Sequence, residues 1–265
     1  MLKEIITKDG FAISKNFLSR DNIDSLNSEI ESLSKKFIFN GNSVGTVWFN
    51  KNYYDVYNPI TNINSINLLE TSVSVAKLIF SKNFDNFRLT NLRVSVEKKN
   101  AYPLDWHKDN MNNVFRAILY LDEVNESNGS LSIVKGSHLK KNDDVKHKVN
   151  LNDKENKDIQ KLNCAAGDII FFDPNIYHKK NSVSKIRRSI MFEFQHKDTV
   201  SNKYVILLDN SKINKTVLEN FKIFETNNQK SKYELNVYSN KIPDNTPLII
   251  YFNLIVKKLF RKIIN

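Results

Sequence analysis

The chain has 265 residues, of which 40% are hydrophobic and 11% aromatic, so it carries too much apolar surface for a disordered protein. A formal charge of +11, from 40 basic and 29 acidic residues, favours anionic partners. The sequence contains no zinc-finger spacing, RNP-like aromatic motif or dense basic run with interleaved aromatics, and we therefore expect no nucleic-acid partner.

The single cysteine and the N-terminal residues indicate the compartment. Cys164 has no second cysteine to pair with, which excludes an intramolecular disulfide and a thiolate metal cluster and fits a reducing environment. Acidic Glu4 and Asp9 stand where a signal peptide needs a basic and then an apolar segment. We therefore expect a cytoplasmic protein.

The first 82 residues predict two helices separated by an aromatic loop. Apolar residues at helical spacing predict an amphipathic helix over 21–36, with Ser19 as its cap, and a second helix over 65–82. Between them, residues 41–64 are rich in Asn, Gly and aromatics without a sustained period. This segment is interpreted as a long loop, either functional or anchored to the core by its aromatics.

Short β-rich runs separated by Gly, Asn, Asp and Pro follow the second helix. Helices first and then several short strands predict a mainly β fold with flanking helices, a β-sandwich or jelly roll with the helices packed on one face. The Lys-rich segment 140–161 is expected to be an exposed insertion. The expected strands are Phe87–Glu97, Val114–Leu121, Leu131–Val134, Ile169–Phe172 and Ile186–Phe194.

A His-x-Asp triplet is the first feature that points to chemistry. In an extended segment, residues two apart project to the same side, so His107 and Asp109 can reach one metal ion. Such a triplet by itself is usually an ordinary surface turn. Downstream, the run Gly167–Asp173 has the pattern of a turn entering a buried strand, and His178 follows it.

An Arg-x-Ser pair completes the pattern. Arg187 and Ser189 follow His178 and share one face of an expected strand, while Arg188 points the other way. Two imidazoles and one carboxylate on one face of an iron ion leave the opposite positions open for 2-oxoglutarate and dioxygen. The far carboxylate of 2-oxoglutarate then needs a fixed cation, and the planar fork of an arginine suits it, with the Ser189 hydroxyl as an added donor.

Four segments together resemble the phytanoyl-CoA dioxygenase-like branch of the Fe(II)/2-oxoglutarate oxygenases. They are KDGFAISKNFLSRDNIDSLNSEIESL (9–33), WHKDN (106–110), ILYLDEVNESNGSLSIVKGSH (118–138) and GDIIFFDPNIYHKKNSVSKIRRSI (167–190). The resemblance implies a double-stranded β-helix, Fe(II) held by His107, Asp109 and His178, and 2-oxoglutarate anchored by Arg187.

The resemblance also separates structural from functional residues. Asn128-Gly129 and Gly136-Ser137-His138 match turns of the family, so His138 is not an expected ligand; His147 and His196 are interpreted as solvated. The segment KKNSVSKI after His178 departs from the Gly-rich turn that is commoner in the family. Its residues Lys179 and Lys180 are interpreted either as a solvated turn or as contacts for an anionic substrate.

Two further side chains and the identity of one ligand refine the expected site. Arg116 and Tyr120 alternate on the strand after the metal motif and either face the co-substrate or serve packing. Asp109 favours hydroxylation over halogenation, because the related halogenases lack this carboxylate. The expected reaction converts 2-oxoglutarate to succinate and carbon dioxide and hydroxylates the substrate. Desaturation, ring closure and epimerisation are open alternatives.

Two other classes of function compete with this hypothesis. A barrel that serves as a binding or scaffold module has no need of an unfilled metal face. A cupin-type metalloenzyme that does not use 2-oxoglutarate typically has His-x-His in its first motif, where this chain has Asp109. The substrate class expected is small or linked to a lipid or glycan, and anionic. Specificity is expected in the loops 41–64, 98–105 and 140–161.

The C-terminal region lies beyond the resemblance. We expect an oxygenase domain over 1–200 and an extension over 201–265. Thr246 and Pro247 form a good helix start, and residues 246–265 predict a basic amphipathic helix without acidic residues. Such a helix suits either the surface of an anionic membrane or docking on the barrel or a second subunit.

Overall fold

A computed structural model describes residues 2–39, 47–50, 53–57, 66–99, 101, 103–109, 111, 113–139, 151, 157–199, 207–209 and 225–227. The helices in these ranges are α1 (Leu2–Asp9), α2 (Arg20–Phe39) and α3 (Ile66–Phe80), with short 3₁₀ turns at Ser81–Asn86 and Ser137–Leu139. The carboxylate of Glu29, on α2, accepts hydrogen bonds of 3.2 Å from the backbone amides of Asn67 and Leu68. This contact satisfies amides at the start of α3 and joins the two helices.

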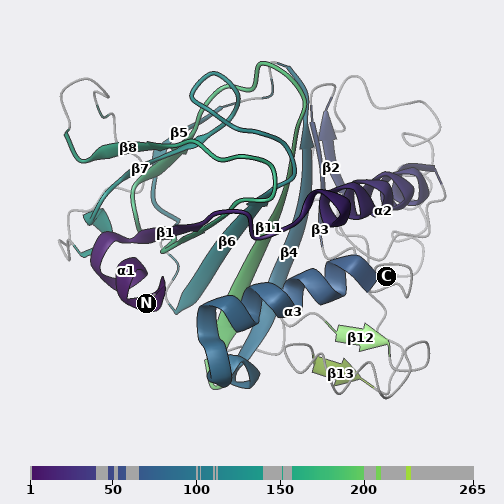
Figure 1. Cartoon of the computed structure of the whole chain (residues 1–265), viewed down its shortest axis with the longest axis horizontal. Helices are drawn as coiled ribbons and strands as arrows, with labels where there is room; N and C mark the ends of the chain where they lie inside the picture. The colour runs from purple at the N-terminus through teal and green to yellow at the C-terminus, as the bar shows by residue number, and fades with distance from the viewer. Residues whose placement is uncertain are drawn as a thin grey trace, which may run out of the picture.

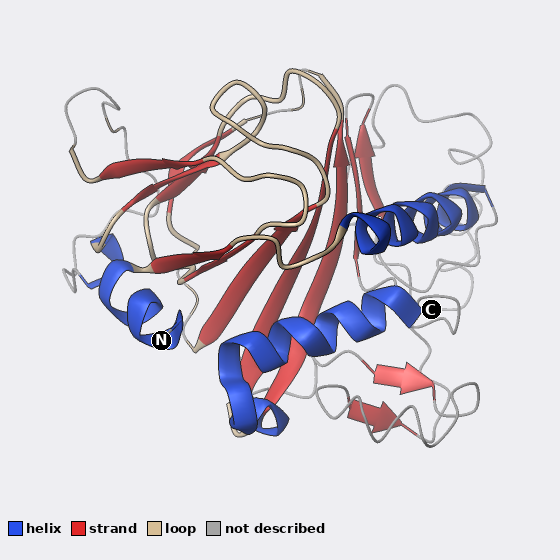
Figure 2. Ribbon diagram, viewed as in Figure 1, coloured by secondary structure: helices blue, strands red, loops and turns tan. Residues whose placement is uncertain are grey.

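The described strands form a sandwich of two antiparallel sheets (Figures 1 and 2). The larger sheet has the order β1-β9-β6-β11-β4-β3-β2 and the smaller one β5-β10-β7-β8. A separate parallel pair joins β12 (Leu207–Asp209) to β13 (Glu225–Asn227). The strands of the larger sheet are β1 (Phe11–Ser14), β2 (Val47–Asn50), β3 (Tyr53–Tyr57), β4 (Phe87–Glu97), β6 (Val114–Tyr120), β9 (Ile169–Phe172) and β11 (Arg187–His196); those of the smaller sheet are β5 (Leu104–His107), β7 (Leu131–Val134), β8 (Ile159–Leu162) and β10 (His178–Lys180).

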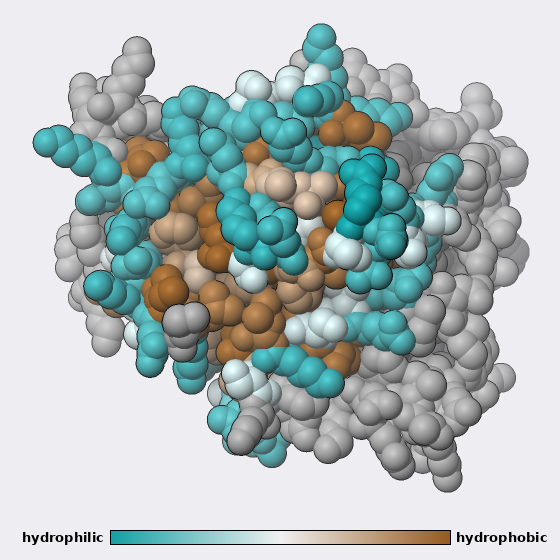
Figure 3. Space-filling view, in the orientation of Figure 1, coloured by the Kyte–Doolittle hydropathy of each residue, from teal (hydrophilic) through white to brown (hydrophobic). Residues whose placement is uncertain are grey.

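Alternation along the strands gives the large sheet two different faces. On β4, Leu92, Val94 and Val96 join the apolar cluster that also contains residues of α2 and α3. Figure 1 shows α3 crossing this face of the sheet. Phe17 and Leu78 pack against this cluster. Figure 3 shows apolar surface in the middle of the same view of the molecule. The helices therefore cover one face, and the opposite face looks into the sandwich.

A second, smaller apolar cluster lies between the two sheets. It includes Ile118, Ile133, Ile170 and Met191, contributed by both sheets. The predicted fold is confirmed, because the chain forms a jelly roll with helices on one face. The five predicted strands form within one or two residues of their expected limits, and the predicted helices correspond to α2 and α3.

Two sequence interpretations are wrong in part. Within the expected loop 41–64, residues 47–50 and 53–57 are the paired strands β2 and β3, which extend the large sheet beyond β4. Strands of four and five residues are too short to show a period, although β-branched and aromatic residues favour them. The end of the expected insertion 140–161 contributes to β8, which pairs with β7; residues 140–150 and 152–156 lie outside the described ranges.

Most of the C-terminal extension lies outside the part of the chain that the structure describes, including all of residues 246–265. The division at residue 200 and the basic amphipathic helix therefore stay predictions. Within the described ranges, no helix has the length and hydropathy that crossing a bilayer requires.

Candidate metal centre and co-substrate pocket

Adjacent strands of the smaller sheet bring the three predicted metal ligands together. His107 ends β5 and His178 begins β10, and the two are direct partners in the antiparallel register. Asp109 follows β5, where its backbone amide donates a 2.9 Å hydrogen bond to the carbonyl of Pro174. The local spacing of His107 and Asp109 and one strand pairing thus build the cluster.

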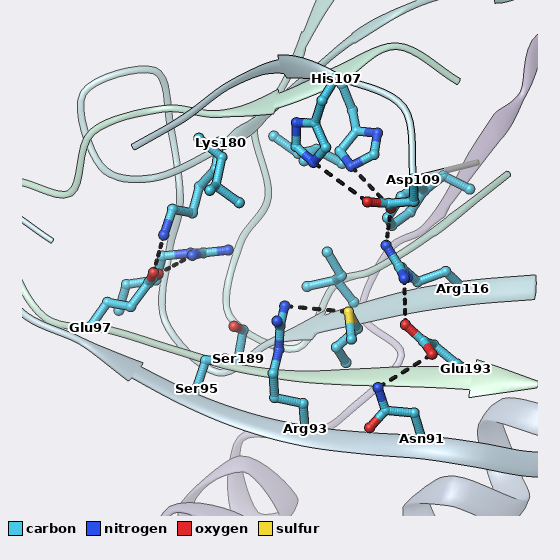
Figure 4. A pocket seen from close by; sticks show the side chains of 17 residues that line it. Asn91, Arg93, Ser95, Glu97, His107, Asp109, Arg116, Lys180, Ser189 and Glu193 are labelled. Carbon is cyan, nitrogen blue, oxygen red and sulfur yellow. Dashed lines mark hydrogen bonds and ion pairs between the residues drawn. The ribbon is translucent and has the colours of Figure 1, made fainter. Parts of the chain in front are cut away.

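The side chains of this triad lie close together, and Figure 4 shows those of His107 and Asp109 pointing toward one another. One ligand atom from each of His107, Asp109 and His178 lies within 4.8 Å of the others. The Nε2 atom of His107 is 3.6 Å from Asp109 Oδ1, and that of His178 is 3.5 Å from Asp109 Oδ2. Two imidazole nitrogens and a carboxylate at such separations could hold one transition-metal ion.

Backbone carbonyls orient both imidazole rings. His107 Nδ1 lies 2.6 Å from the carbonyl of Asp105, and His178 Nδ1 lies 2.9 Å from that of Ile176. A carbonyl only accepts, so each Nδ1 carries a proton, and in the neutral ring the Nε2 then keeps its lone pair for a metal. Burial lowers the pKa of His178 to about 4 and keeps its ring neutral at physiological pH, as a metal ligand must be.

The triad opens into a cavity of about 360 Å³ between the two sheets. Its walls are unusually polar for the interior of a barrel, because the inward-facing positions of β4 and β11 carry charged or hydroxyl side chains. The lining residues are Asn91, Arg93, Ser95, Glu97, Leu104, His107, Asp109, Arg116, Ile118, Leu131, Phe172, His178, Lys180, Arg187, Ser189, Met191 and Glu193.

Arg187 lies in the wall of this cavity, and only 5% of its surface is exposed. Its guanidinium forms an ion pair with the buried carboxylate of Glu97, which also pairs with Lys180. Burial opposes ionisation of Glu97, but the two cations outweigh it and hold the pKa of Glu97 below its ordinary value. Gly129, at φ +69°, leaves room for the arginine, since a Cβ atom there would be 2.7 Å from Arg187 Cδ.

The residues around Arg187 fit a carboxylate ligand. Ser189 lines the same cavity, and the ring of Tyr120 lies 5.2 Å from the guanidinium carbon. Arg187 Nε has no hydrogen-bond partner among the described residues, whereas the Tyr120 hydroxyl is buried outside the cavity lining and interacts with the Arg187 guanidinium. Buried donors without partners are rare in proteins and suit an anion such as the far carboxylate of 2-oxoglutarate.

Other residues considered in the sequence take different places. Arg116 lines the cavity but pairs with Asp109, one of the three candidate metal ligands. Lys180 lines the cavity, whereas Lys179 lies over the Trp106 ring, 5.1 Å from its centroid. His138 is near Thr7, with its Nε2 3.0 Å from the Thr7 carbonyl.

Sequence reasoning missed the partners of the arginines. The carboxylates of Glu97 and Glu193, and the polar residues on the inner face of β4, received no role from their local sequence. A signal was present: Arg93, Ser95 and Glu97 alternate with Val94 and Val96 on an expected strand. A polar stripe on the inner face of a barrel indicates a ligand pocket.

Comparisons with known proteins agree with this geometry. The family model described as Phytanoyl-CoA dioxygenase (PhyH) matches residues 6–189. A probable alpha-ketoglutarate-dependent hypophosphite dioxygenase from Stutzerimonas stutzeri is 29% identical over 89 residues, and the match spans 31% of each chain. The chain thus matches about a third of the length of this curated relative.

Solved structures share the fold at low sequence identity. The non-haem alpha-ketoglutarate-dependent epimerase SnoN from nogalamycin biosynthesis has a TM-score of 0.57 at 16% identity, covering 74% of this chain and 82% of that one. AviO1 from Streptomyces viridochromogenes Tue57 has a TM-score of 0.56 at 21% sequence identity, and the match covers 76% of this chain and 96% of that one. HygX from Streptomyces hygroscopicus, solved with nickel and 2-oxoglutarate, has a TM-score of 0.56 at 14% sequence identity, and the match covers 77% of this chain and 92% of that one.

The jelly roll brings two histidines and an aspartate together in the lining of a polar cavity, the arrangement by which non-haem oxygenases hold Fe(II) with positions left open. The chain belongs to the phytanoyl-CoA dioxygenase family, since the match covers more than half of its length. The family resemblance expected from the sequence is confirmed.

Proposed function

We propose that this chain is a dioxygenase that binds Fe(II) through His107, Asp109 and His178 and 2-oxoglutarate through Arg187. The observation that carries the proposal is the convergence of the three ligand atoms within 4.8 Å, in the wall of a cavity that also contains Arg187. Two neutral nitrogens and one carboxylate leave positions of the metal open for a co-substrate and dioxygen.

The residues of the chain bind and orient the reactants. Iron and 2-oxoglutarate, when bound, would activate dioxygen as the oxidant, so that one oxygen atom enters succinate as carbon dioxide leaves and the other enters the hydroxylated substrate. Arg187 pairs with the far carboxylate of 2-oxoglutarate, assisted by the hydroxyl of Ser189. Lys180 keeps a cation beside Glu97 when Arg187 engages the co-substrate.

The charges of the cavity support a small, polar, anionic substrate. Four cationic side chains line it, Arg93, Arg116, Lys180 and Arg187, against the three carboxylates of Glu97, Asp109 and Glu193. A ferrous ion adds two positive charges and 2-oxoglutarate takes two away, which leaves one positive charge for the substrate. A volume of about 360 Å³, shared with 2-oxoglutarate, suits a small molecule.

Two measurements test the metal and co-substrate sites. Mn²⁺ replaces Fe(II) in the first measurement because it does not oxidise, and anaerobic calorimetry is expected to show one Mn²⁺ bound per chain. In the second measurement, the Mn²⁺-loaded chain is expected to bind one molecule of 2-oxoglutarate. Asp109→Ala should abolish Mn²⁺ binding. Asp105→Ala, which removes an exposed carboxylate two residues before His107 on the same strand, should leave Mn²⁺ binding unchanged. Equal binding by both variants would exclude the proposed triad.

Turnover separates the proposal from its two rivals. With Fe(II), 2-oxoglutarate and dioxygen, the enzyme should release succinate, and a panel of small carboxylates, phosphonates and phosphinates should accelerate that release more than their neutral analogues do. A binding or scaffold module would release none. A cupin-type metalloenzyme would oxidise its substrate equally well without 2-oxoglutarate.

The lipid- or glycan-linked form of the substrate prediction depends on residues 246–265, which are outside the described ranges. If this basic segment contacts anionic membranes, the full chain should pellet with anionic vesicles more than a chain ending at residue 245. Equal partition of the two forms would contradict the membrane contact and leave a freely diffusing substrate.

A further inference from the structure

Arg116 connects a candidate metal ligand to a second buried carboxylate. Its Nη1 donates to Oδ2 of Asp109, and its Nη2 donates to Oε1 of Glu193 (Figure 4). The guanidinium also lies 3.2 Å from the Met111 sulfur and over the Phe172 ring, 5.9 Å from its centroid. Polar and apolar contacts together fix the plane of the guanidinium beside the triad.

The register of the large sheet places these side chains in one row. Glu193 on β11 lies directly opposite Arg116 on β6 and opposite Asn91 on β4. Asn91 Nδ2 donates a 3.3 Å hydrogen bond to Glu193 Oε2. The pairing between β11 and β4 is irregular beside this row, because Phe194 pairs with Leu89 and Thr90 is skipped. Irregularities of this kind re-aim side chains and recur next to active sites.

The contact leaves the two oxygens of Asp109 in different environments. Each oxygen faces one histidine, Oδ1 the Nε2 of His107 at 3.6 Å and Oδ2 the Nε2 of His178 at 3.5 Å, but Oδ2 also accepts from Arg116. A carboxylate free to rotate can bind a metal through both oxygens and so take up a position that 2-oxoglutarate or dioxygen needs. An oxygen already held by a guanidinium donates less readily to a metal.

We propose that Arg116, held by Glu193, is a positioning residue that fixes Asp109 so that Oδ1 alone is offered to the metal. The inference rests on the proposed function, because it takes the triad to be the metal site. Arg116 need not touch the substrate or 2-oxoglutarate in this role, which replaces the co-substrate contact that its position on the strand suggested.

Glu193 has a separate task in this arrangement. The positive guanidinium of Arg116 would repel a metal ion beside it. Glu193, next to that guanidinium, is only 6% exposed, so little solvent is present to screen this repulsion. The Glu193 carboxylate neutralises the arginine, while Asn91 holds its second oxygen. Arg116 can therefore orient Asp109 without adding net charge to the metal site, because the charge of Glu193 cancels its own.

Comparison of two substitutions distinguishes orientation from charge. Arg116→Lys keeps the positive charge but loses the fork that reaches both carboxylates, whereas Arg116→Gln loses the charge. Arg188→Lys is the matched control, because Arg188 is on β11 of the same sheet and makes a bidentate pair with Asp122 but does not line the cavity. Mn²⁺ affinity of each folded, metal-free protein is measured by calorimetry, with the melting temperature recorded alongside.

The proposal predicts that Arg116→Lys weakens Mn²⁺ binding by about tenfold, the lower end of the range for lost contacts to metal ligands. Arg116→Gln should lose less affinity, since relief of the repulsion offsets part of the lost orientation, and Arg188→Lys should lose none. A change of less than about threefold for Arg116→Lys would overturn the proposal, even if its melting temperature falls, because a purely structural role predicts that pattern.

Further outcomes remain decisive. If Arg116→Lys does not fold, Glu193→Gln takes its place: it keeps an acceptor oxygen, leaves the arginine charge uncompensated, and should weaken Mn²⁺ binding by about threefold or more; unchanged affinity would overturn the proposal. If the wild-type chain binds no Mn²⁺, or Asp109→Ala binds it equally well, the proposed function itself fails. A failure confined to Arg116 and Glu193 leaves the metal site standing.

Discussion

Replacing Glu97 by Gln should destabilise the ligand-free protein and at the same time increase its response to 2-oxoglutarate. Glu97 is 5% exposed and pairs with two cations, Lys180 and Arg187, in the wall of the cavity. The amide keeps the shape of the side chain and one acceptor oxygen. It removes the charge, so two buried cations face each other without an anion between them.

The magnitude follows from the burial of the cluster. Breaking a buried ion pair by removing one partner costs about 3–5 kcal/mol, and the acceptor that Gln retains places this substitution near about 3 kcal/mol. For a chain of this size, about 3 kcal/mol corresponds to a fall in melting temperature of roughly 6–12 °C. The far carboxylate of 2-oxoglutarate would replace the missing anion, and hence bind the variant more tightly than the wild type.

The assay is thermal unfolding of both proteins with Mn²⁺, with and without saturating 2-oxoglutarate. The rise in melting temperature on adding 2-oxoglutarate should be several degrees larger for Glu97→Gln than for the wild type, because ligand binding adds stability in proportion to the logarithm of affinity. Equal rises in the two proteins would refute the assignment of Arg187 as the co-substrate anchor. Glu123→Gln, on the surface turn after β6, is the control.

The remaining predictions concern stability and reactivity. The two cations hold the pKa of Glu97 below its ordinary value of 4.5, so the carboxylate contributes to the free energy of unfolding above pH 4.5. This contribution is lost as the pH falls below 4.5, and the free energies of unfolding of the wild type and Glu97→Gln should therefore become equal in acid. Asp168→Ala should lower the free energy of unfolding by about 3 kcal/mol in denaturant titrations, since its buried carboxylate accepts from Lys15 at 2.7 Å and from two backbone amides. Burial raises the pKa of Cys164 to about 12, so thiol reagents at pH 8 should label it only after unfolding. Gly129→Ala should weaken 2-oxoglutarate binding about tenfold in calorimetry, because its Cβ would displace Arg187 and its φ is strained.

The convergence of His107, Asp109 and His178 depends on local spacing and one strand pair, and the first of these can be predicted from the sequence. His107 and Asp109 are two residues apart, and any extended conformation brings them to one side. The pairing of β10 with β5 brings His178 to them; the family resemblance implied His178 as a ligand, but neither of these two strands was among those expected. The expected strands were equally accessible, since each is a buried run bounded by turn residues.

The two short strands β2 and β3 show where local reasoning fails. Their residues carry no period long enough to separate strand from loop, and their place in the sheet depends on the neighbouring strand β4. Tertiary pairing decides such segments more than intrinsic preference does. The same dependence on neighbours explains why Glu97 and Glu193 received no role from the sequence.

Both charged clusters of the cavity depend on the register of β11. Arg187 lies opposite Glu97 on β4, and six residues later Glu193 lies opposite Arg116 on β6. An even separation along one strand keeps both on the inner face, and a slip of one residue would turn both outward. The outward face of β11 carries Ile190 and Phe192, fully buried against the helices, so such a slip would also expose the core. The hydrophobic packing beneath α3 therefore fixes the register that aligns Arg187 with Glu97 and Glu193 with Arg116.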